Sequence, residues 1–288
     1  MRSLPSPRLL RVLIAAGLGL ATVAAGPAAA APGDVYVALG DSFASGPLIP
    51  NQVDLGCLRS DHDYPRLLAS RLGVATFRDV TCSGADTGDF TSAQPRSFLG
   101  RALPPAPPQY DALSADTTLV TITIGGNDTD LLDVAQDCVN LLPFQTPCRR
   151  RYVVDGVDTV AARIDAFAPT LGAVADQVRA RSPRARVVFT GYGLFIRRNG
   201  CWPVVPVYGS DATWLQGLVD RLNAAIAAQA RAHGAAYVDL RTPGAGHDAC
   251  SSASQKWIEG FVPSNVAAPL HPNGRGEAAY AQIIDDTL

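Results

Sequence analysis

The feature that most constrains the fold is a regular alternation of short apolar runs, rich in β-branched residues, with longer helical patterns. Runs of the first kind are typical of strands buried on both faces of a parallel sheet. We predict such strands at Val35–Leu39, Leu119–Ile124, Val187–Thr190 and Ala236–Leu240, and a weaker one at Thr76–Asp79. The helical patterns lie at about Tyr64–Leu72, Thr159–Arg181 and Trp214–His233, and from Arg275 towards the C-terminus. This order predicts an α/β fold, a three-layer α/β/α sandwich with a parallel sheet.

The N-terminus has the layout of a secretory signal peptide. Arginines near the start precede an apolar stretch from Val12 to about Ala25, and the small residues of Pro27–Ala31 follow. The apolar stretch is too short and wrongly flanked for a membrane anchor. We therefore predict a signal peptide over residues 1–30, cleaved near Ala30, and a single secreted domain over residues 31–288.

The charge and cysteine content narrow the class of protein. A net charge of -2, with only 17% charged residues, argues against a nucleic-acid partner or an electrostatic membrane anchor. We expect a monomer that acts on a neutral or weakly charged substrate without a metal or other cofactor. In an exported chain the cysteines predict disulfides rather than metal ligands. Sequence alone leaves many pairings open, one of which is consecutive: Cys57 with Cys82, Cys138 with Cys148 and Cys201 with Cys250.

Three further segments are of interest for the substrate. Gln94–Pro108 is rich in proline, which removes backbone donors, so we predict a surface loop that forms one wall of a binding groove. Asp137–Cys148 is apolar and broken by proline, and two interpretations stay open: it shapes an acyl pocket, or it packs as a clipped loop. Together with Trp202–Val207 it favours an acyl chain over a bare acetyl group.

Polar residues follow three of the predicted strands. Because ligands bind at the carboxyl ends of parallel strands, Gly40-Asp41-Ser42, Thr81–Thr87 and Gly125–Asp128 are expected to face one crevice. A strand, a turn and a helix start also describe a phosphate site, but the Asp41 carboxylate would repel phosphate. Ser42 is then either a helix cap or a nucleophile.

Attack of a serine hydroxyl on an ester creates an oxyanion, which needs donors already in place. The side-chain amide of Asn127 and the backbone N–H groups of Gly84 and Ser42 can supply them. Either Gly84 or Asn127 alone would be explained by ordinary turn chemistry. All three donors around one serine predict an oxyanion hole.

Activation of the serine requires a base, and the chain has four histidines. His233 stands before a glycine at a predicted helix end, and His62 lies in a polar loop. His247 is the main competitor, but its position near Cys250 favours a structural or substrate-side role. His271 lies in the irregular stretch Ala268–Gly276 before the last helix. Because such a loop can reach the strand ends, we predict His271 as the general base.

These residues form four blocks that closely resemble those of the SGNH, or GDSL, hydrolase superfamily: Gly40-Asp41-Ser42, Gly84 within Cys82–Thr87, Gly125–Asp128 and His271-Pro272-Asn273. The resemblance covers essentially the whole mature chain. It implies a flavodoxin-like sheet and hydrolysis of carboxylic esters, with Ser42 as nucleophile, Gly84 and Asn127 completing the oxyanion hole, and His271 as base. The cysteine spacing is similar to that of secreted bacterial lipases and esterases of this family, whose bridges join consecutive cysteines.

One part of the family pattern is missing. Many members carry an aspartate three residues before the catalytic histidine, where this chain has Ala268, and neither Pro269 nor Leu270 offers an acceptor side chain. We predict a Ser–His dyad in which a main-chain carbonyl of Ala268 or Pro269 orients His271. Asp41 and Asp128 are expected to fix their loops through backbone hydrogen bonds.

Alternative functions remain to be separated from lipid-ester hydrolysis. The same machinery could remove acetyl groups from carbohydrates, and short-chain esters, triacylglycerols and phospholipids all fit the chemistry. A glycosidase would use Asp41 and Asp128 as a carboxylate pair, which leaves Ser42 and His271 without a role. A secreted protein that binds lipid or carbohydrate without catalysis is the non-enzymatic alternative.

Overall fold

The computed structural model describes Met1 and residues 34–142 and 144–288, so the predicted signal peptide lies outside the described residues. A parallel sheet of five strands, in the order β11-β10-β7-β1-β4, forms the centre of the described chain. This is the strand order of a flavodoxin-like sheet. Its strands are β1 (Val35–Gly40), β4 (Thr76–Asp79), β7 (Leu119–Thr123), β10 (Arg186–Thr190) and β11 (Ala236–Val238).

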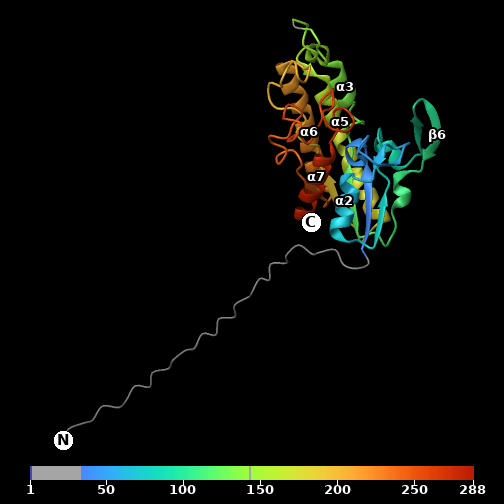
Figure 1. The fold of residues 1–288 in the computed structure, drawn as a ribbon. Coiled ribbons are helices and arrows are strands. Elements are labelled where there is room, and N and C mark those ends of the chain that lie inside the picture. The colour runs from blue at the N-terminus through green and yellow to red at the C-terminus, as the bar shows by residue number, and fades with distance from the viewer. Residues whose placement is uncertain (2–33, 143) are drawn as a thin grey trace.

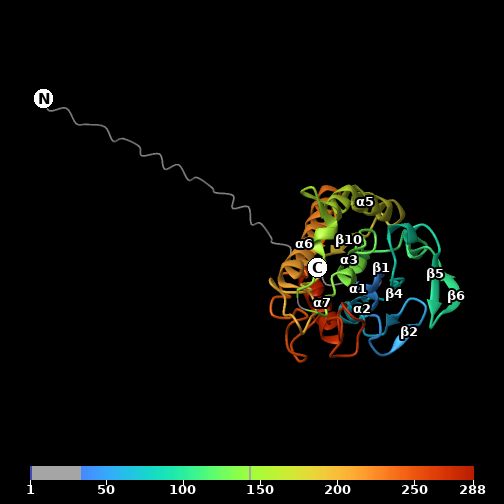
Figure 2. The same ribbon diagram turned by 90° about the horizontal axis from the view of Figure 1, so that it is seen from above.

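Helices cover both faces of the sheet (Figures 1 and 2). The pair α2 (Tyr64–Leu72) and α7 (Gly274–Thr287) packs on one face, and the pair α5 (Thr159–Arg181) and α6 (Gly209–Ala232) packs on the other. The predicted three-layer α/β/α sandwich is therefore confirmed. None of the helices in the described ranges is long and apolar enough to cross a membrane. The short helices are α1 (Ser42–Ser45), α3 (Leu131–Asp137), α4 (Arg149–Tyr152), η1 (Thr87–Phe90) and η2 (Gln109–Ala112).

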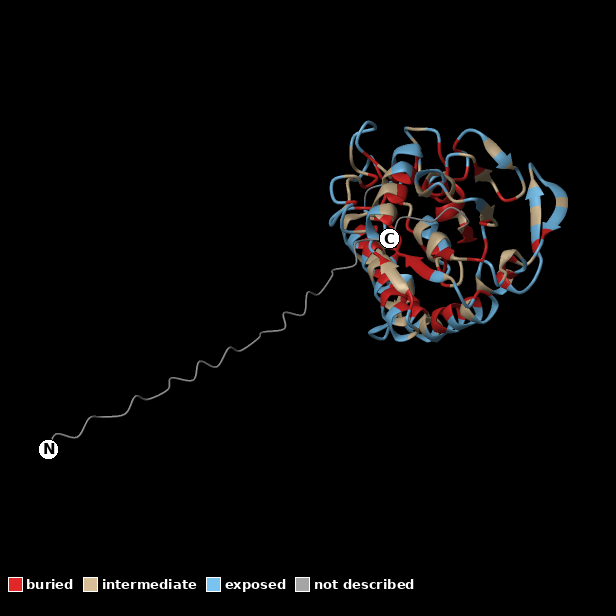
Figure 3. Ribbon diagram, turned by 90° about the horizontal axis from the view of Figure 1, so that it is seen from below, coloured by how far each residue is buried: buried red, intermediate tan, exposed pale blue. Residues whose placement is uncertain are grey.

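Local chemistry explains where the main elements begin. Every residue of β1 and β7 is buried, as expected for strands covered on both faces (Figure 3). Three side chains cap helices by accepting from a backbone N–H of the first turn: Asp63 for α2, Asp158 for α5 and Asn273 for α7. These caps set the starts of α2 and α5 at the predicted residues. Helix α6 begins earlier than predicted, at Gly209 rather than Trp214.

The prediction of a loop at Gln94–Pro108 is wrong. Most of this segment forms an antiparallel hairpin of β5 (Gln94–Phe98) and β6 (Arg101–Ala106), which projects from the side of the molecule (Figure 1). Both strands of a two-stranded hairpin are edge strands. Their prolines therefore need not donate backbone hydrogen bonds to a third strand. Two smaller hairpins were also not predicted: β2 (Gln52–Asp54) with β3 (Arg59–Ser60), and β8 (Val153–Val154) with β9 (Val157–Asp158).

The cysteines pair consecutively, as the family resemblance implies. Each bridge joins loop or helix-end segments rather than two strands of the central sheet. The first holds the segment that carries Gly84, and the second closes the loop between α3 and α4. The bridges are Cys57–Cys82, Cys138–Cys148 and Cys201–Cys250.

Candidate active site

Ser42 stands at the start of α1, in a turn that only glycine can begin. Gly40 ends β1 with a φ of 153°, and a Cβ there would lie 2.6 Å from the carbonyl oxygen of Thr123. The side chain of Gln109 binds both polar backbone groups of Gly40. The Gly40 N–H donates to Gln109 Oε1 at 2.8 Å, and Gln109 Nε2 donates to the Gly40 carbonyl oxygen at 3.0 Å. The Asp41 N–H donates to Thr123 across 3.0 Å. These contacts fix the backbone that presents Ser42 at the carboxyl end of the sheet.

Asp41 stabilises this turn, as predicted. Its Oδ1 accepts from the N–H of Phe43 at 2.8 Å, and its Oδ2 accepts from the hydroxyl of Tyr192. The side chain is buried, and this burial raises the pKa of Asp41 to about 7 against the opposing effect of the hydrogen bonds from Tyr192 and Phe43. Although Asp41 lines the cavity, both of its carboxylate oxygens are therefore engaged in hydrogen bonds within the site.

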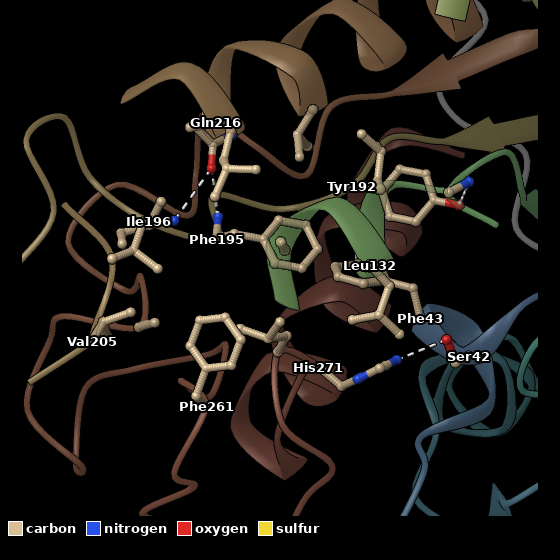
Figure 4. Close-up of a pocket in the computed structure, with 18 of the residues that line it drawn as sticks. Ser42, Phe43, Leu132, Tyr192, Phe195, Ile196, Val205, Gln216, Phe261 and His271 are labelled. Atoms are coloured by element: carbon tan, nitrogen blue, oxygen red, sulfur yellow. Dashed lines mark hydrogen bonds between the residues drawn. The ribbon is translucent and has the colours of Figure 1, made fainter. Parts of the chain in front are cut away.

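The structure brings Ser42 and His271 together. His271 Nε2 lies 2.7 Å from Ser42 Oγ, and His271 Nδ1 lies 2.7 Å from the carbonyl oxygen of Pro269 (Figure 4). A carbonyl can only accept, so Nδ1 carries the proton and Nε2 accepts from the serine hydroxyl. Among the described residues, no carboxylate lies within hydrogen-bond distance of the ring. Burial lowers the pKa of His271 below its usual 6.5, and the hydrogen bond to Pro269 opposes that shift.

Main-chain contacts on both sides hold the loop of His271. The N–H of Glu259 donates to the His271 carbonyl at 3.0 Å, and the N–H of Ala268 donates to the carbonyl of Pro47 at 2.9 Å. The buried Glu259 carboxylate also accepts from the side chain of Asn273, which caps α7, at 2.7 Å. Because Pro47 follows α1 closely, the histidine loop is attached directly to the segment that carries the serine.

The predicted oxyanion donors lie on adjoining loops. Asn127 lines the same cavity as Ser42, and its Nδ2 donates to the carbonyl of Ala85 at 2.8 Å, which leaves a second amide hydrogen. Within the described ranges, the N–H groups of Ser42 and Gly84 have no protein acceptor. Gly84 does not line the cavity, although its neighbour Ala85 is bound to Asn127. The Ser42 N–H and the second amide hydrogen of Asn127 are therefore available as donors in the cavity.

An apolar cavity begins beside Ser42 and His271 and runs away from them. In Figure 4 Phe43 and Leu132 lie near the serine, Phe261 lies farther along, and Val205 lies at the far end. Polar groups along it are satisfied internally: Gln216 Oε1 accepts from the backbone N–H groups of Phe195 and Ile196, at 2.9 and 3.2 Å. The cavity can accept a hydrocarbon chain whose polar end remains at Ser42.

Comparison with known proteins identifies the family. Residues 38–279 match the model of the GDSL-like Lipase/Acylhydrolase family. The chain belongs to this family. It is 36% identical to Lipase 2 of Streptomyces coelicolor over 99% of each chain, and 32% identical to Lipase 1 of the same organism over 96% of each.

Solved structures agree with this GDSL assignment. Phospholipase A1 from Streptomyces albidoflavus superposes with a TM-score of 0.72 at 31% identity, covering 89% of this chain and 100% of that one. The extracellular lipase of Streptomyces rimosus gives 0.72 at 30% identity, covering 88% and 100%. The protein is accordingly a carboxylic ester hydrolase, and the sequence resemblance to the GDSL superfamily is confirmed.

The structure contradicts one prediction about the substrate cavity of this GDSL enzyme and decides between two interpretations that the sequence left open. The hairpin at Gln94–Pro108 does not line the cavity, and neither does the loop between Cys138 and Cys148. Instead α3, which precedes that loop, contributes Leu132 and Ala135 to the wall. Both cysteines are buried in a small core cluster behind the cavity wall, together with Val205 and Val207, so the packing alternative holds for them. The prediction for Trp202–Val207 is confirmed in part, because Val205 and Val207 line the cavity.

The remaining predicted polar residues have structural partners in the enzyme. Asp128 Oδ1 accepts from the N–H of Thr87 at 3.0 Å, in agreement with the expected loop-fixing role. His233 lies at the C-terminal end of α6, as predicted, and contacts Asp176. His247 stacks on Trp257, with ring centroids 4.1 Å apart.

Sequence reasoning missed Tyr192 in this GDSL site. Its hydroxyl accepts from the N–H of Gly126 at 2.8 Å and donates to Asp41. It thus joins the turn of Ser42 to the loop of Asn127. A signal was present, because Tyr192 comes directly after the predicted strand Val187–Thr190 and its following glycine, at the same sheet edge as the other loops.

Proposed function

We propose that the enzyme hydrolyses lipid acyl esters through an acyl-enzyme on Ser42. His271 acts as general base and later as general acid, and the oxyanion hole consists of the N–H groups of Ser42 and Gly84 and the side chain of Asn127. The observation that carries this proposal is the 2.7 Å contact between His271 Nε2 and Ser42 Oγ, in the tautomer that accepts the serine proton. The apolar cavity beside this pair supports an acyl substrate.

The proposed reaction proceeds in two halves. Ser42 Oγ attacks the ester carbonyl carbon while its proton moves to His271 Nε2, and the carbonyl oxygen becomes the oxyanion held by the donors. The Pro269 carbonyl accepts from Nδ1–H and stabilises the imidazolium that forms. Collapse of the intermediate expels the alcohol, which takes the proton from Nε2. Water then repeats the sequence on the acyl-enzyme and releases the acid.

The cavity favours an acyl chain over an acetyl group. Its walls are supplied by aliphatic and aromatic side chains, among them Leu132, Phe195, Val205 and Phe261. An acetyl group would leave nearly all of this surface in contact with water, so a carbohydrate deacetylase fits less well. The names of similar proteins, lipases and a phospholipase, support the same substrate class.

We further propose that the mature protein is a secreted monomer with one domain over residues 31–288, preceded by a signal peptide over residues 1–30. Three disulfides in the described chain and the likeness to an extracellular lipase support export. N-terminal sequencing of protein from the culture medium tests the cleavage near Ala30, and light scattering on the same sample tests the monomer. Protein recovered from the culture medium with its apolar N-terminus still attached would contradict the proposed cleavage.

The substrate proposal is tested with p-nitrophenyl esters of increasing acyl length. We expect kcat/KM to rise from acetate to medium or long chains, because each further methylene removes apolar surface from water in the cavity. Ser42→Ala and His271→Ala should remove this activity, whereas His62→Ala, at an exposed histidine outside the site, should retain it. Highest activity on acetate would favour the deacetylase, and no turnover would favour a binding protein.

A further inference from the structure

An exposed apolar tip projects from the loop between Cys138 and Cys148. We use "tip" for its residues Leu141, Leu142 and Phe144, whose exposed fractions are 73%, 63% and 100%. The loop lies at the top of the molecule in Figure 1, beyond α3. Large apolar side chains that gather on an exposed loop are typical of an interaction surface.

The tip is held in this projecting position. The Cys138–Cys148 disulfide closes the loop at its base. The N–H of Asn140 donates to the carbonyl of Pro206 at 2.7 Å, and the indole N–H of Trp202 donates back to the Asn140 carbonyl at 2.9 Å. The apolar side chains are therefore presented to solvent by a braced loop instead of folding back onto the core.

Three consecutive arginines follow the tip. Arg149, Arg150 and Arg151 are the first three residues of α4, directly after Cys148, and all three are exposed. Arg151 Nη2 lies 4.0 Å from Asp137 Oδ2, whereas the side chains of Arg149 and Arg150 make no ion pair within the described ranges. The protein as a whole carries a net charge of -2, so this cationic cluster is a local feature. An apolar tip beside unpaired arginines matches a surface of anionic lipid.

The loop that carries the tip does not line the substrate cavity itself, but it joins two segments that do. Helix α3 supplies Leu132 and Ala135 to the cavity wall and leads directly into the loop that carries the tip. The loop also packs on the segment that carries Val205, which Figure 4 places at the end of the cavity remote from Ser42. A lipid whose ester reached Ser42 could thus have its acyl chain directed along the cavity towards the tip.

We propose that the tip and Arg149–Arg151 dock the enzyme on an anionic phospholipid surface. Leu141, Leu142 and Phe144 enter the boundary between headgroups and acyl chains, and the arginines contact the phosphates. This inference concerns the partner of the proposed active site, but docking itself does not require catalysis.

Vesicle co-sedimentation of the Ser42→Ala protein tests docking without hydrolysis. We expect binding to phosphatidylcholine vesicles that contain phosphatidylglycerol, and much weaker binding to phosphatidylcholine alone or at high salt. Phe144→Ser should lower the partition coefficient about tenfold, and Arg149→Gln and Arg150→Gln about fivefold each. Matched controls are Leu99→Ser, 86% exposed at the β5–β6 turn, and Arg101→Gln in the same hairpin, which should bind as the parent does.

Hydrolysis by variants that retain Ser42 separates docking from catalysis. Phe144→Ser should retain the parent rate on a soluble short-chain ester and lose rate only on vesicles. The docking proposal is overturned if vesicle binding is absent or does not depend on anionic lipid. It is also overturned if Leu99→Ser lowers binding as much as Phe144→Ser does. A dimer that Phe144→Ser dissociates, without vesicle binding, would show that the tip faces a second copy and would also overturn it. Vesicle binding without any ester turnover would uphold docking and contradict the proposed function.

Discussion

Tyr192 donates its hydroxyl hydrogen to the buried carboxylate of Asp41, the residue that directly precedes Ser42. The same hydroxyl accepts from the N–H of Gly126, the residue before Asn127. One phenol oxygen therefore couples the turn of the proposed nucleophile to the loop of a proposed oxyanion donor. The relative positions of these two groups decide how well the transition state is stabilised.

Tyr192→Phe should lower kcat about tenfold to a hundredfold with little change in KM, because it releases the two loops that hold the oxyanion donors and leaves the acyl cavity in place. Steady-state kinetics on a soluble ester measure the effect. Tyr237→Phe is the matched control, at a half-buried tyrosine of β11 outside the site, and should leave kcat unchanged. A rise in KM at constant kcat would instead assign Tyr192 to substrate binding.

The pH dependence of the rate should follow the neutral form of His271. Burial lowers the pKa of this imidazole below 6.5, so the protonated, inactive form is populated only at acidic pH. We expect kcat/KM to rise with pH through a midpoint below 6.5 and to stay level through neutrality. A rate profile on a soluble ester, corrected for spontaneous hydrolysis, determines the midpoint. A midpoint above 6.5 would contradict the proposed environment of the ring.

The sequence predicts those parts of the molecule that depend on local chemistry. The bounds of α2 and α5 match their predicted ranges because helical patterns and capping residues act within a few positions. The loops of Ser42, Gly84 and Asn127 were found because each follows a strand of one parallel sheet, whereas His271 was found as the histidine of the irregular stretch before the last helix. The absence of an acceptor side chain before His271 likewise pointed to a main-chain carbonyl, and the structure places the ring against that of Pro269.

What could not be predicted depends on contacts between distant segments. Tyr192 matters because its ring meets Asp41, which lies 151 positions away along the chain. The cavity wall on α3 required the packing of that helix against α6. The hairpin at Gln94–Pro108 forms despite its prolines because it pairs only with itself, which a count of prolines does not reveal.

Filling the cavity should shift the chain-length preference. Ala135 lines the cavity from α3, and Ala135→Phe places a ring where the middle of an acyl chain would lie. We expect kcat/KM for long-chain esters to fall about tenfold or more while that for acetate is retained. Gln136→Phe adds the same ring at the next, exposed position and should not alter the preference. Parallel losses on short and long esters would show that the acyl chain does not occupy this space.

Glu277→Gln should stabilise the protein in a pH-dependent way. Glu277 is buried, its Oε2 accepts from the N–H of Tyr64 at 2.7 Å, and its Oε1 has no partner in the described chain. Burial raises the pKa of Glu277 well above 4.5, so the wild type loses stability as the pH rises above the ordinary range of glutamate. Glutamine carries no charge and can still accept from Tyr64.

We expect Glu277→Gln to increase the free energy of unfolding by about 1–3 kcal/mol at mildly alkaline pH, and much less at about pH 4. Urea denaturation at the two pH values measures the difference. Asp133→Asn, at an exposed carboxylate of α3, should change stability little at either pH. The account of Glu277 is wrong if its variant has the same effect under both conditions.

The central claim is that His271 activates Ser42 for attack on an acyl carbon. Covalent labelling with a p-nitrophenyl alkylphosphonate, followed by peptide mass spectrometry, tests this claim most directly. We predict one adduct per chain, on Ser42, with a labelling rate that falls at least about a hundredfold in His271→Ala. An adduct on another residue, or labelling of Ser42 at the wild-type rate without His271, would contradict the proposed mechanism.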